Sequence, residues 1–129
     1  MAKTVAEMVA EANAQIEVVS PLDAAAESER GDVVFLDVRE PVEWEHHIPG
    51  AVQIPRGLLE FAADPASPRH HEALQPDARV VVYCRSGVRA ALAALTLITM
   101  GYENVVNLEG GITAWQAAGL PTAEHHGEI

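Results

Sequence analysis

The sequence predicts an α/β protein in which helices cover both faces of a mostly parallel sheet. Two observations support this fold class. Short runs of apolar, β-branched residues alternate along the chain with segments whose apolar residues recur at helical spacing. The strongest runs are continuously apolar and do not alternate with polar residues, which is typical of parallel strands that are buried on both faces.

The first part of the chain carries two helix signals. Residues 4–7 are Thr-Val-Ala-Glu, a capping box that predicts a helix to about residue 14. Residues 16–19 are short and mostly β-branched, as in an edge strand. Ser20 and Pro21 then provide an N-cap and a first-turn proline, which predicts a helix over the residues that follow.

The middle of the chain predicts three further strands. Residues 33–36 and 80–83 are the strongest apolar runs, and residues 52–54 form a shorter one. Between these strands we expect one or two helical turns over residues 41–46 and a helix over residues 57–63.

The last part of the chain predicts a helix, a strand and a closing helix. The first helix has an apolar face and ends at Gly101, a residue that suits a helix C-terminus. Residues 104–108 form an apolar strand, Gly110-Gly111 a turn, and residues 112–118 a helix. The predicted apolar face of the first helix consists of Val88, Ala91, Leu92, Leu95 and Ile98.

Length and charge limit the function classes. The 129 residues suffice for one domain with a sizeable core. The formal net charge of −11 argues against nucleic acids and anionic membranes as partners, because both require a basic surface. We find no signal peptide at the N-terminus and no apolar stretch long enough to span a bilayer, so we expect a cytoplasmic protein.

The single cysteine of the chain, Cys84, follows directly on a predicted strand. A lone cysteine excludes an internal disulfide and a zinc site built from several thiolates. The strand end is the place where α/β sheets bind ligands. A helix begins about four residues later, so the backbone N–H groups of residues 85–89 are expected to point toward the sulfur. These N–H groups, together with the positive charges of Arg85 and Arg89, are expected to favour the thiolate form of Cys84 and to lower its pKa.

The residues around Cys84 predict a small anionic substrate. Ser86 and Gly87 are small enough for a tight loop, and Gly87 can adopt a positive φ angle. The chain has only eight Lys and Arg residues, and two of them flank this thiol. The alternative is that Cys84 is a small buried core residue. The coincidence of strand, loop, arginines and helix favours a nucleophile instead.

Four segments of the chain resemble the rhodanese family of sulfurtransferases, in the family's order. They are residues 37–40 (Asp-Val-Arg-Glu, with Trp44 and Glu45 behind), 47–51 (His-Ile-Pro-Gly-Ala), 84–89 (Cys-Arg-Ser-Gly-Val-Arg) and 107–111 (Asn-Leu-Glu-Gly-Gly, ending in Trp115). The resemblance covers the chain from about Ile16 to Pro121. One departure is His46, where many family members have glycine; it concerns the local turn and leaves the cysteine chemistry untouched.

The resemblance implies a five-stranded parallel sheet and three parts of the chain. These are an N-terminal helical extension (residues 1–15), a rhodanese-like domain (residues 16–122) and a flexible C-terminal tail (residues 123–129).

The resemblance also implies a thiosulfate sulfurtransferase-type reaction without a cofactor. Cys84 would take the outer sulfur of thiosulfate or a similar small anionic donor and hold it as a persulfide. Cyanide, a thiol, or a thioredoxin-like or other sulfur-acceptor protein would then remove this sulfur. The loop residues that would bind the donor and the persulfide are Arg85, Ser86, Gly87, Val88 and Arg89.

Other functions stay open at this point. A persulfide carrier that serves a partner protein would have the same loop, and a non-catalytic interaction module would share the fold. Cysteine phosphatases and arsenate reductases use a related architecture, but a phosphatase loop has one more residue between cysteine and arginine. Only four residues separate Cys84 from Arg89, so this loop suits a single sulfur atom better than a phosphate.

Asp37 and Arg39 lie at a strand end and could line the site. We favour structural roles for both, with Asp37 capping the following turn and Arg39 pairing with Glu43 or Glu45. The acidic side chains of this segment, which include Glu40, are otherwise expected to form a solvated helical face.

Metal and nucleotide sites are not predicted. The histidines occur as adjacent pairs (residues 46–47, 70–71 and 125–126), and adjacent side chains do not face the same way on a helix. Gly110 and Gly111 lack the wider glycine pattern of a nucleotide site.

Overall fold

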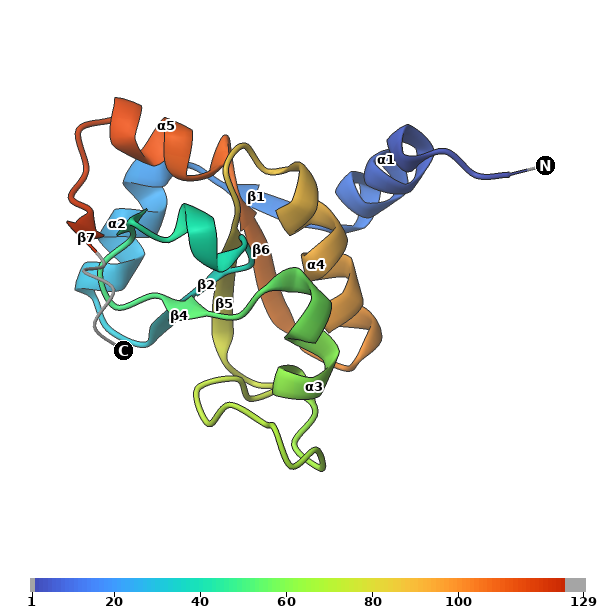
Figure 1. The fold of residues 1–129 in the computed structure, drawn as a ribbon. Helices are drawn as coiled ribbons and strands as arrows, with labels where there is room; N and C mark the ends of the chain where they lie inside the picture. Colours follow the sequence, from blue (N-terminus) through green and yellow to red (C-terminus); the bar gives the residue numbers. More distant parts are fainter. Residues whose placement is uncertain (1, 125–129) are drawn as a thin grey trace.

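A five-stranded parallel sheet forms the centre of the computed structural model, which describes residues 2–124 (Figure 1). The strand order β1-β6-β5-β2-β4 places β5 in the middle, and every neighbouring pair is parallel. The strands are β1 (Glu17–Val19), β2 (Val33–Asp37), β4 (Val52–Gln53), β5 (Arg79–Tyr83) and β6 (Asn104–Leu108). The predicted fold class and the edge position of the first strand are confirmed.

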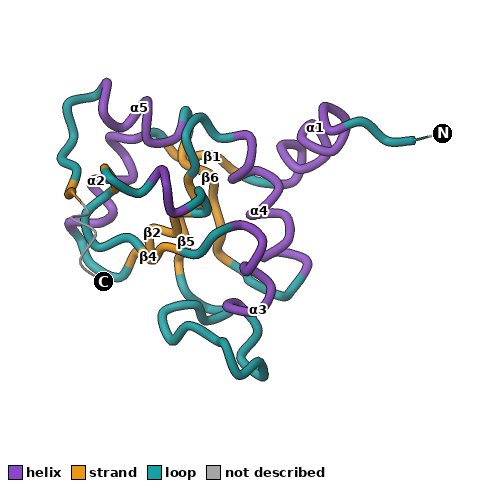
Figure 2. The backbone as a smooth tube through the Cα atoms, in the orientation of Figure 1, coloured by secondary structure: helices purple, strands orange, loops and turns teal. Residues whose placement is uncertain are grey.

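Helices cover both faces of this sheet, so that the strands lie between two helical layers (Figure 2). Helices α2 and α5 enclose one core, in which the Phe35 and Trp115 rings meet edge to face at 5.5 Å. Helices α1, α3 and α4 enclose the other core. The helices are α1 (Val5–Gln15), α2 (Pro21–Glu29), α3 (Leu59–Ala63), α4 (Val88–Thr99) and α5 (Gly111–Ala117), with 3-10 turns η1 (Pro41–Glu43) and η2 (Arg56–Leu58).

Two predicted helix starts are confirmed in detail. The Thr4 hydroxyl accepts the Glu7 N–H at 3.0 Å, and the Glu7 carboxylate accepts the Thr4 N–H at 2.9 Å. At α2, the Ser20 hydroxyl accepts the Asp23 N–H at 3.1 Å. Such caps satisfy backbone donors that have no partner inside the helix.

The buried face of α4 differs from the predicted one. Val88 is 51% exposed, and the larger apolar side chains of the predicted face are only half-buried. The fully buried residues are Ala90, Ala91, Ala93, Ala94 and Leu97. The small alanine side chains let α4 lie close to the sheet, and α1 packs beside it.

A second, two-stranded sheet was not predicted. β3 (His46–His47) pairs antiparallel with β7 (Ala123–Glu124), so the segment expected to be helical over residues 41–46 is the short turn η1 followed by a strand. Two residues of the expected C-terminal tail thus pair with the segment before Ile48. Residues 125–129 of that tail, including the last histidine pair, lie outside the described residues. Across residues 2–124 no helix has both the length and the apolar character needed to cross a bilayer.

Candidate active site

Cys84 lies at the carboxyl end of β5, the central strand, four residues before α4 begins. Its sulfur accepts the backbone N–H of Gly87 at 3.1 Å and that of Ala90 at 3.4 Å. Residues 85–89 were expected to supply these donors; Gly87 does so, and Ala90 lies one position beyond the expected range. Cys84 itself is only 1% exposed. The arrangement gives the Cys84 sulfur two backbone hydrogen bonds and places it at the start of a helix.

The loop after Cys84 turns sharply at Gly87. This residue has a φ angle of +110° and forms the N-cap of α4. Its carbonyl accepts the side-chain N–H of Asn107 at 3.0 Å and the backbone N–H of Ala91 at 3.0 Å. Two further residues predicted to bind the donor, Ser86 on this loop and Val88 at the start of α4, are both exposed.

Asn107 is a site residue that our sequence reasoning missed. It is 5% exposed and extends from β6 to hold the loop through the Gly87 carbonyl. A polar side chain inside the apolar run of residues 104–108 was the available signal, because a buried amide needs a specific partner.

The start of α5 packs directly against the Cys84 loop. The backbone N–H groups of Ile112 and Thr113 donate to the carbonyls of Cys84 and Arg85 at 3.0 Å and 3.2 Å. At Gly111, whose φ angle is +63°, an added Cβ would lie 2.6 Å from the Cys84 carbonyl oxygen and closer still to that of Arg85. The glycine is therefore needed for this close approach as well as for the turn.

Replacement of Gly111 by alanine is expected to lower the free energy of unfolding by about 2 kcal/mol or more. Left-handed backbone strain and a backbone clash both contribute to the loss. The matched control is Gly119→Ala, because Gly119 also has a positive φ (+78°) but, among the residues that the structure describes, no atom within 4 Å of an added Cβ. Urea unfolding of both variants measures the difference. Equal losses in the free energy of unfolding would show that the contact with the Cys84 loop does not stabilise the protein.

The two arginines near Cys84 differ in their ion pairing. Arg89 makes a two-pronged ion pair with Glu43, with N–O distances of 2.8 Å and 2.9 Å. Arg85 is exposed and makes no ion pair within residues 2–124. The expectation that Glu43 belongs to a solvated acidic face is therefore wrong, since its carboxylate faces Arg89 from η1.

The ion pair lowers the pKa of Glu43 to about 2. The hydrogen bonds from Arg89 are the main cause, the Glu40 N–H adds to them, and burial opposes the shift. The same pair raises the pKa of Arg89. A carboxyl group whose pKa is lower in the folded protein adds stability above its unfolded pKa and loses it as the pH falls.

Glu43→Gln is accordingly expected to destabilise the protein by about 1 kcal/mol near neutral pH, where solvent screening limits the effect of such a partly exposed pair. The difference from wild type should shrink as the pH falls from about 4.5 towards 2. Urea unfolding between pH 3 and 7 is the measurement, and Arg89→Gln should show the same pH window. A difference independent of pH would contradict this assignment of the ion pair.

Asp37 and Arg39 form a buried network at the end of β2. Asp37 is fully buried and Arg39 is 5% exposed, and two N–H groups of the guanidinium donate to the carboxylate at 3.0 Å and 2.8 Å. The Tyr83 hydroxyl donates to Asp37 at 2.9 Å and accepts the Ile48 N–H at 3.1 Å. Burial is the main cause of the raised pKa of Tyr83, and the Asp37 charge adds to it.

These contacts correct two expectations. Arg39 pairs with Asp37, and not with Glu43 or Glu45; it also donates to the His46 carbonyl at 2.8 Å. Asp37 accepts the Arg39 backbone N–H at 3.0 Å and does not cap the Pro41 turn.

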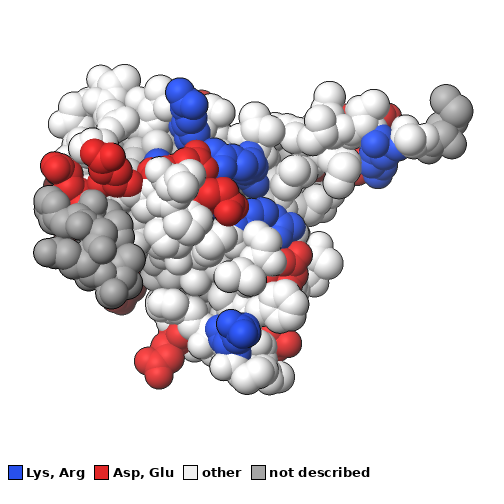
Figure 3. Space-filling model, viewed as in Figure 1, with Lys and Arg blue, Asp and Glu red and all other residues white. Residues whose placement is uncertain are grey.

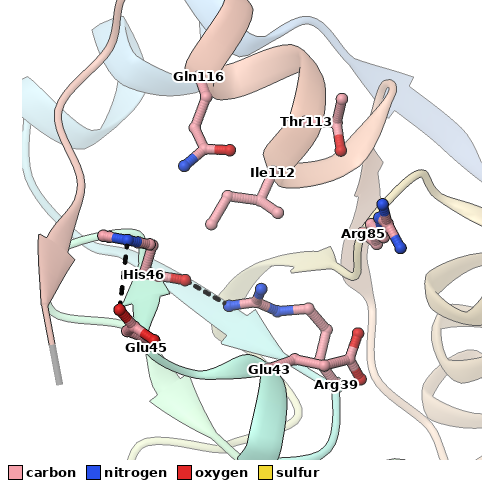
Figure 4. Close-up of a pocket in the computed structure, with 8 residues that line it drawn as sticks. All are labelled: Arg39, Glu43, Glu45, His46, Arg85, Ile112, Thr113 and Gln116. Atoms are coloured by element: carbon pink, nitrogen blue, oxygen red, sulfur yellow. Dashed lines mark hydrogen bonds and ion pairs between the residues drawn. The ribbon is translucent and has the colours of Figure 1, made fainter.

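A pocket of about 330 Å³ opens between the Cys84 loop, the segment after β2 and α5. In Figure 4 the Arg39 guanidinium points toward its centre, and side chains of α5 project from above. Cys84 is not among the lining residues, but the next residue, Arg85, is. The lining residues are Arg39, Glu43, Glu45, His46, Arg85, Ile112, Thr113 and Gln116.

Comparisons with known proteins identify the family of this chain. A family model for the Rhodanese-like domain matches residues 20–118. A sulfurtransferase of Allochromatium vinosum is 37% identical over 114 residues, covering 84% of this chain and 99% of the relative. The chain therefore belongs to the rhodanese-like domain family, and its relatives include sulfurtransferases.

Two solved structures share the fold closely. A Rhodopseudomonas palustris protein, described as of unknown function and a possible tyrosine phosphatase, is 41% identical with a TM-score of 0.87 over 95% of this chain and 96% of that one. The polysulfide-sulfur transferase homodimer of Wolinella succinogenes is 31% identical with a TM-score of 0.73, covering 94% of this chain and 88% of that one.

Proposed function

We propose that this protein transfers a sulfane sulfur from thiosulfate or a similar donor to a thiol or cyanide through a persulfide on Cys84. The observation that carries the proposal is the position of the Cys84 sulfur. It lies at the end of the central strand, accepts two backbone N–H groups, and is the only thiol of the chain. The sulfurtransferases among its relatives support the same chemistry.

In the first step the Cys84 thiolate attacks the outer sulfur of thiosulfate. A bond forms between the two sulfur atoms, the bond to the sulfonate sulfur breaks, and sulfite leaves with its electron pair. The Gly87 and Ala90 N–H groups are placed to stabilise the charge on the sulfur. Cys84 is almost fully buried, so the donor sulfur reaches it at the base of the loop that follows β5.

In the second step an acceptor thiolate or cyanide attacks the outer persulfide sulfur, and the Cys84 thiolate leaves. Exposed Arg85 attracts the anionic donor, and Ser86 is available as a hydrogen-bond donor to the outer sulfur. A thioredoxin-like or other sulfur-acceptor protein in the cytoplasm is a fitting natural acceptor, since a lone thiol is kept reduced there.

Phosphatase activity is the competing proposal, since one structural relative is described that way. The loop argues against it here. Only four residues separate Cys84 from Arg89, and the Arg89 guanidinium is bound to Glu43 instead of facing a free anion site.

Steady-state kinetics with thiosulfate and cyanide test the proposal. A double displacement gives parallel lines in double-reciprocal plots, with sulfite and thiocyanate formed in equal amounts. Intersecting lines would contradict a persulfide intermediate. Hydrolysis of an aryl phosphate that depends on Cys84, without any sulfur transfer, would establish the phosphatase alternative.

A further inference from the structure

Glu43 occupies the anion-binding face of Arg89. Both of its carboxylate oxygens accept guanidinium N–H groups, at 2.8 Å and 2.9 Å, and one of them also accepts the Glu40 backbone N–H at 3.0 Å. A guanidinium in such a two-pronged pair has its preferred carboxylate-binding edge filled. A sulfonate would have to displace Glu43 to reach that edge.

The charges around the pocket cancel. Asp37 neutralises Arg39, and Glu43 neutralises Arg89. The other charged residues of the lining are Arg85 and Glu45, and His46 lies 3.8 Å from the Glu45 carboxylate. Figure 3 shows basic and acidic side chains next to one another in the upper middle of the visible face. The whole chain carries a net charge of −11, so the wider field also repels anions.

This charge pattern fits thiosulfate poorly. Thiosulfate is a dianion, and a donor that enters this pocket meets the carboxylates of Glu43 and Glu45 as well as the guanidinium of Arg85. The carboxylates repel a dianion, most strongly where water is partly excluded. The Ile112 side chain in the pocket lining offers an apolar contact that an organic group can use and a sulfonate cannot.

We infer that Glu43 selects for organic persulfides over thiosulfate as sulfur donors. The inference rests on the proposed function and specifies its substrate class. With a persulfide R–S–SH, the Cys84 thiolate attacks the outer sulfur, the S–S bond of the donor breaks, and the thiolate R–S⁻ leaves. Cys84 keeps the outer sulfur with its proton as a persulfide. The leaving group carries one negative charge fewer than sulfite.

The test compares kcat/KM for thiosulfate and for 2-hydroxyethyl persulfide, with cyanide as the common acceptor. Glu43→Gln should raise the thiosulfate-to-persulfide ratio about tenfold, mainly through KM, because it removes a repelling charge and frees Arg89. The ratio also cancels any change in the reactivity of Cys84 itself. The matched control is Glu103→Gln, which removes the same charge from an exposed residue. Glu103 lies just before the first residue of β6, at the end of the strand away from the Cys84 loop.

A second measurement needs no variant. Salt screens charge, so the ratio of kcat/KM for thiosulfate to that for the persulfide should rise with ionic strength in the wild-type protein if the site repels the dianion. A ratio that falls with salt, or that Glu43→Gln leaves unchanged or lowers, would overturn the inference. Failure of both donors to add sulfur to Cys84, as judged by mass, would instead overturn the proposed function.

Discussion

Replacement of Cys84 by serine is expected to abolish sulfur transfer, with a loss on the order of 10⁴-fold or more. A serine hydroxyl stays protonated at neutral pH and forms no persulfide, so neither step of the double displacement can proceed. The two backbone N–H groups that meet the sulfur would remain in place, since they belong to the turn at Gly87 and the first turn of α4. The measurement is thiocyanate formation from thiosulfate and cyanide.

The loss must be separated from misfolding. Serine differs from cysteine by one atom, and the loop is also held by Asn107 and by α5, so the thermal unfolding temperature should change little. A Cys84→Ser protein that keeps its fold and a tenth or more of its activity would contradict the assignment of Cys84 as the sulfur carrier.

Replacement of Asp37 by asparagine is expected to lower the free energy of unfolding by about 3–5 kcal/mol. Asp37 is fully buried and Arg39 is 5% exposed, so the variant leaves a buried guanidinium without its counter-charge. The Tyr83 hydroxyl also loses a charged acceptor. Urea unfolding at neutral pH measures the effect.

Tyr83→Phe is the matched control in the same network. It removes the hydroxyl and leaves the Ile48 N–H without its partner, but it keeps the ion pair, so a smaller loss of about 1–3 kcal/mol is expected. A loss for Asp37→Asn no larger than that for Tyr83→Phe would show that the buried ion pair contributes little.

The elements with strong local signals were predictable from the sequence. The apolar runs that became β2 and β5 and the caps at Thr4 and Ser20 depend on neighbouring residues alone. The position of Cys84 at the end of a strand followed from the same runs, whereas the central place of that strand in the sheet is seen only in the structure.

The partners of the charged residues were not predictable in this way. Arg89 pairs with Glu43, 46 positions earlier in the chain, and the sequence shows only that both charges exist. Likewise, Tyr83 meets Asp37 only because β2 and β5 are neighbours in register. Such pairings depend on the tertiary arrangement, which local patterns do not specify.

Close backbone contacts were missed for a related reason. Gly111 has the sequence appearance of an ordinary turn residue, yet it allows α5 to approach the Cys84 loop. The pairing of β7 with β3 involves only two residues on each strand and offers no apolar run to detect.

The persulfide on Cys84 can be detected by intact mass measurement of the protein after incubation with excess thiosulfate. We expect a gain of about 32 Da, one sulfur atom, that cyanide or dithiothreitol removes and that Cys84→Ser never shows. The reduced thiol must first be verified by alkylation of an untreated sample. No sulfur adduct on the reduced protein, with thiosulfate or with an organic persulfide, would contradict the persulfide account.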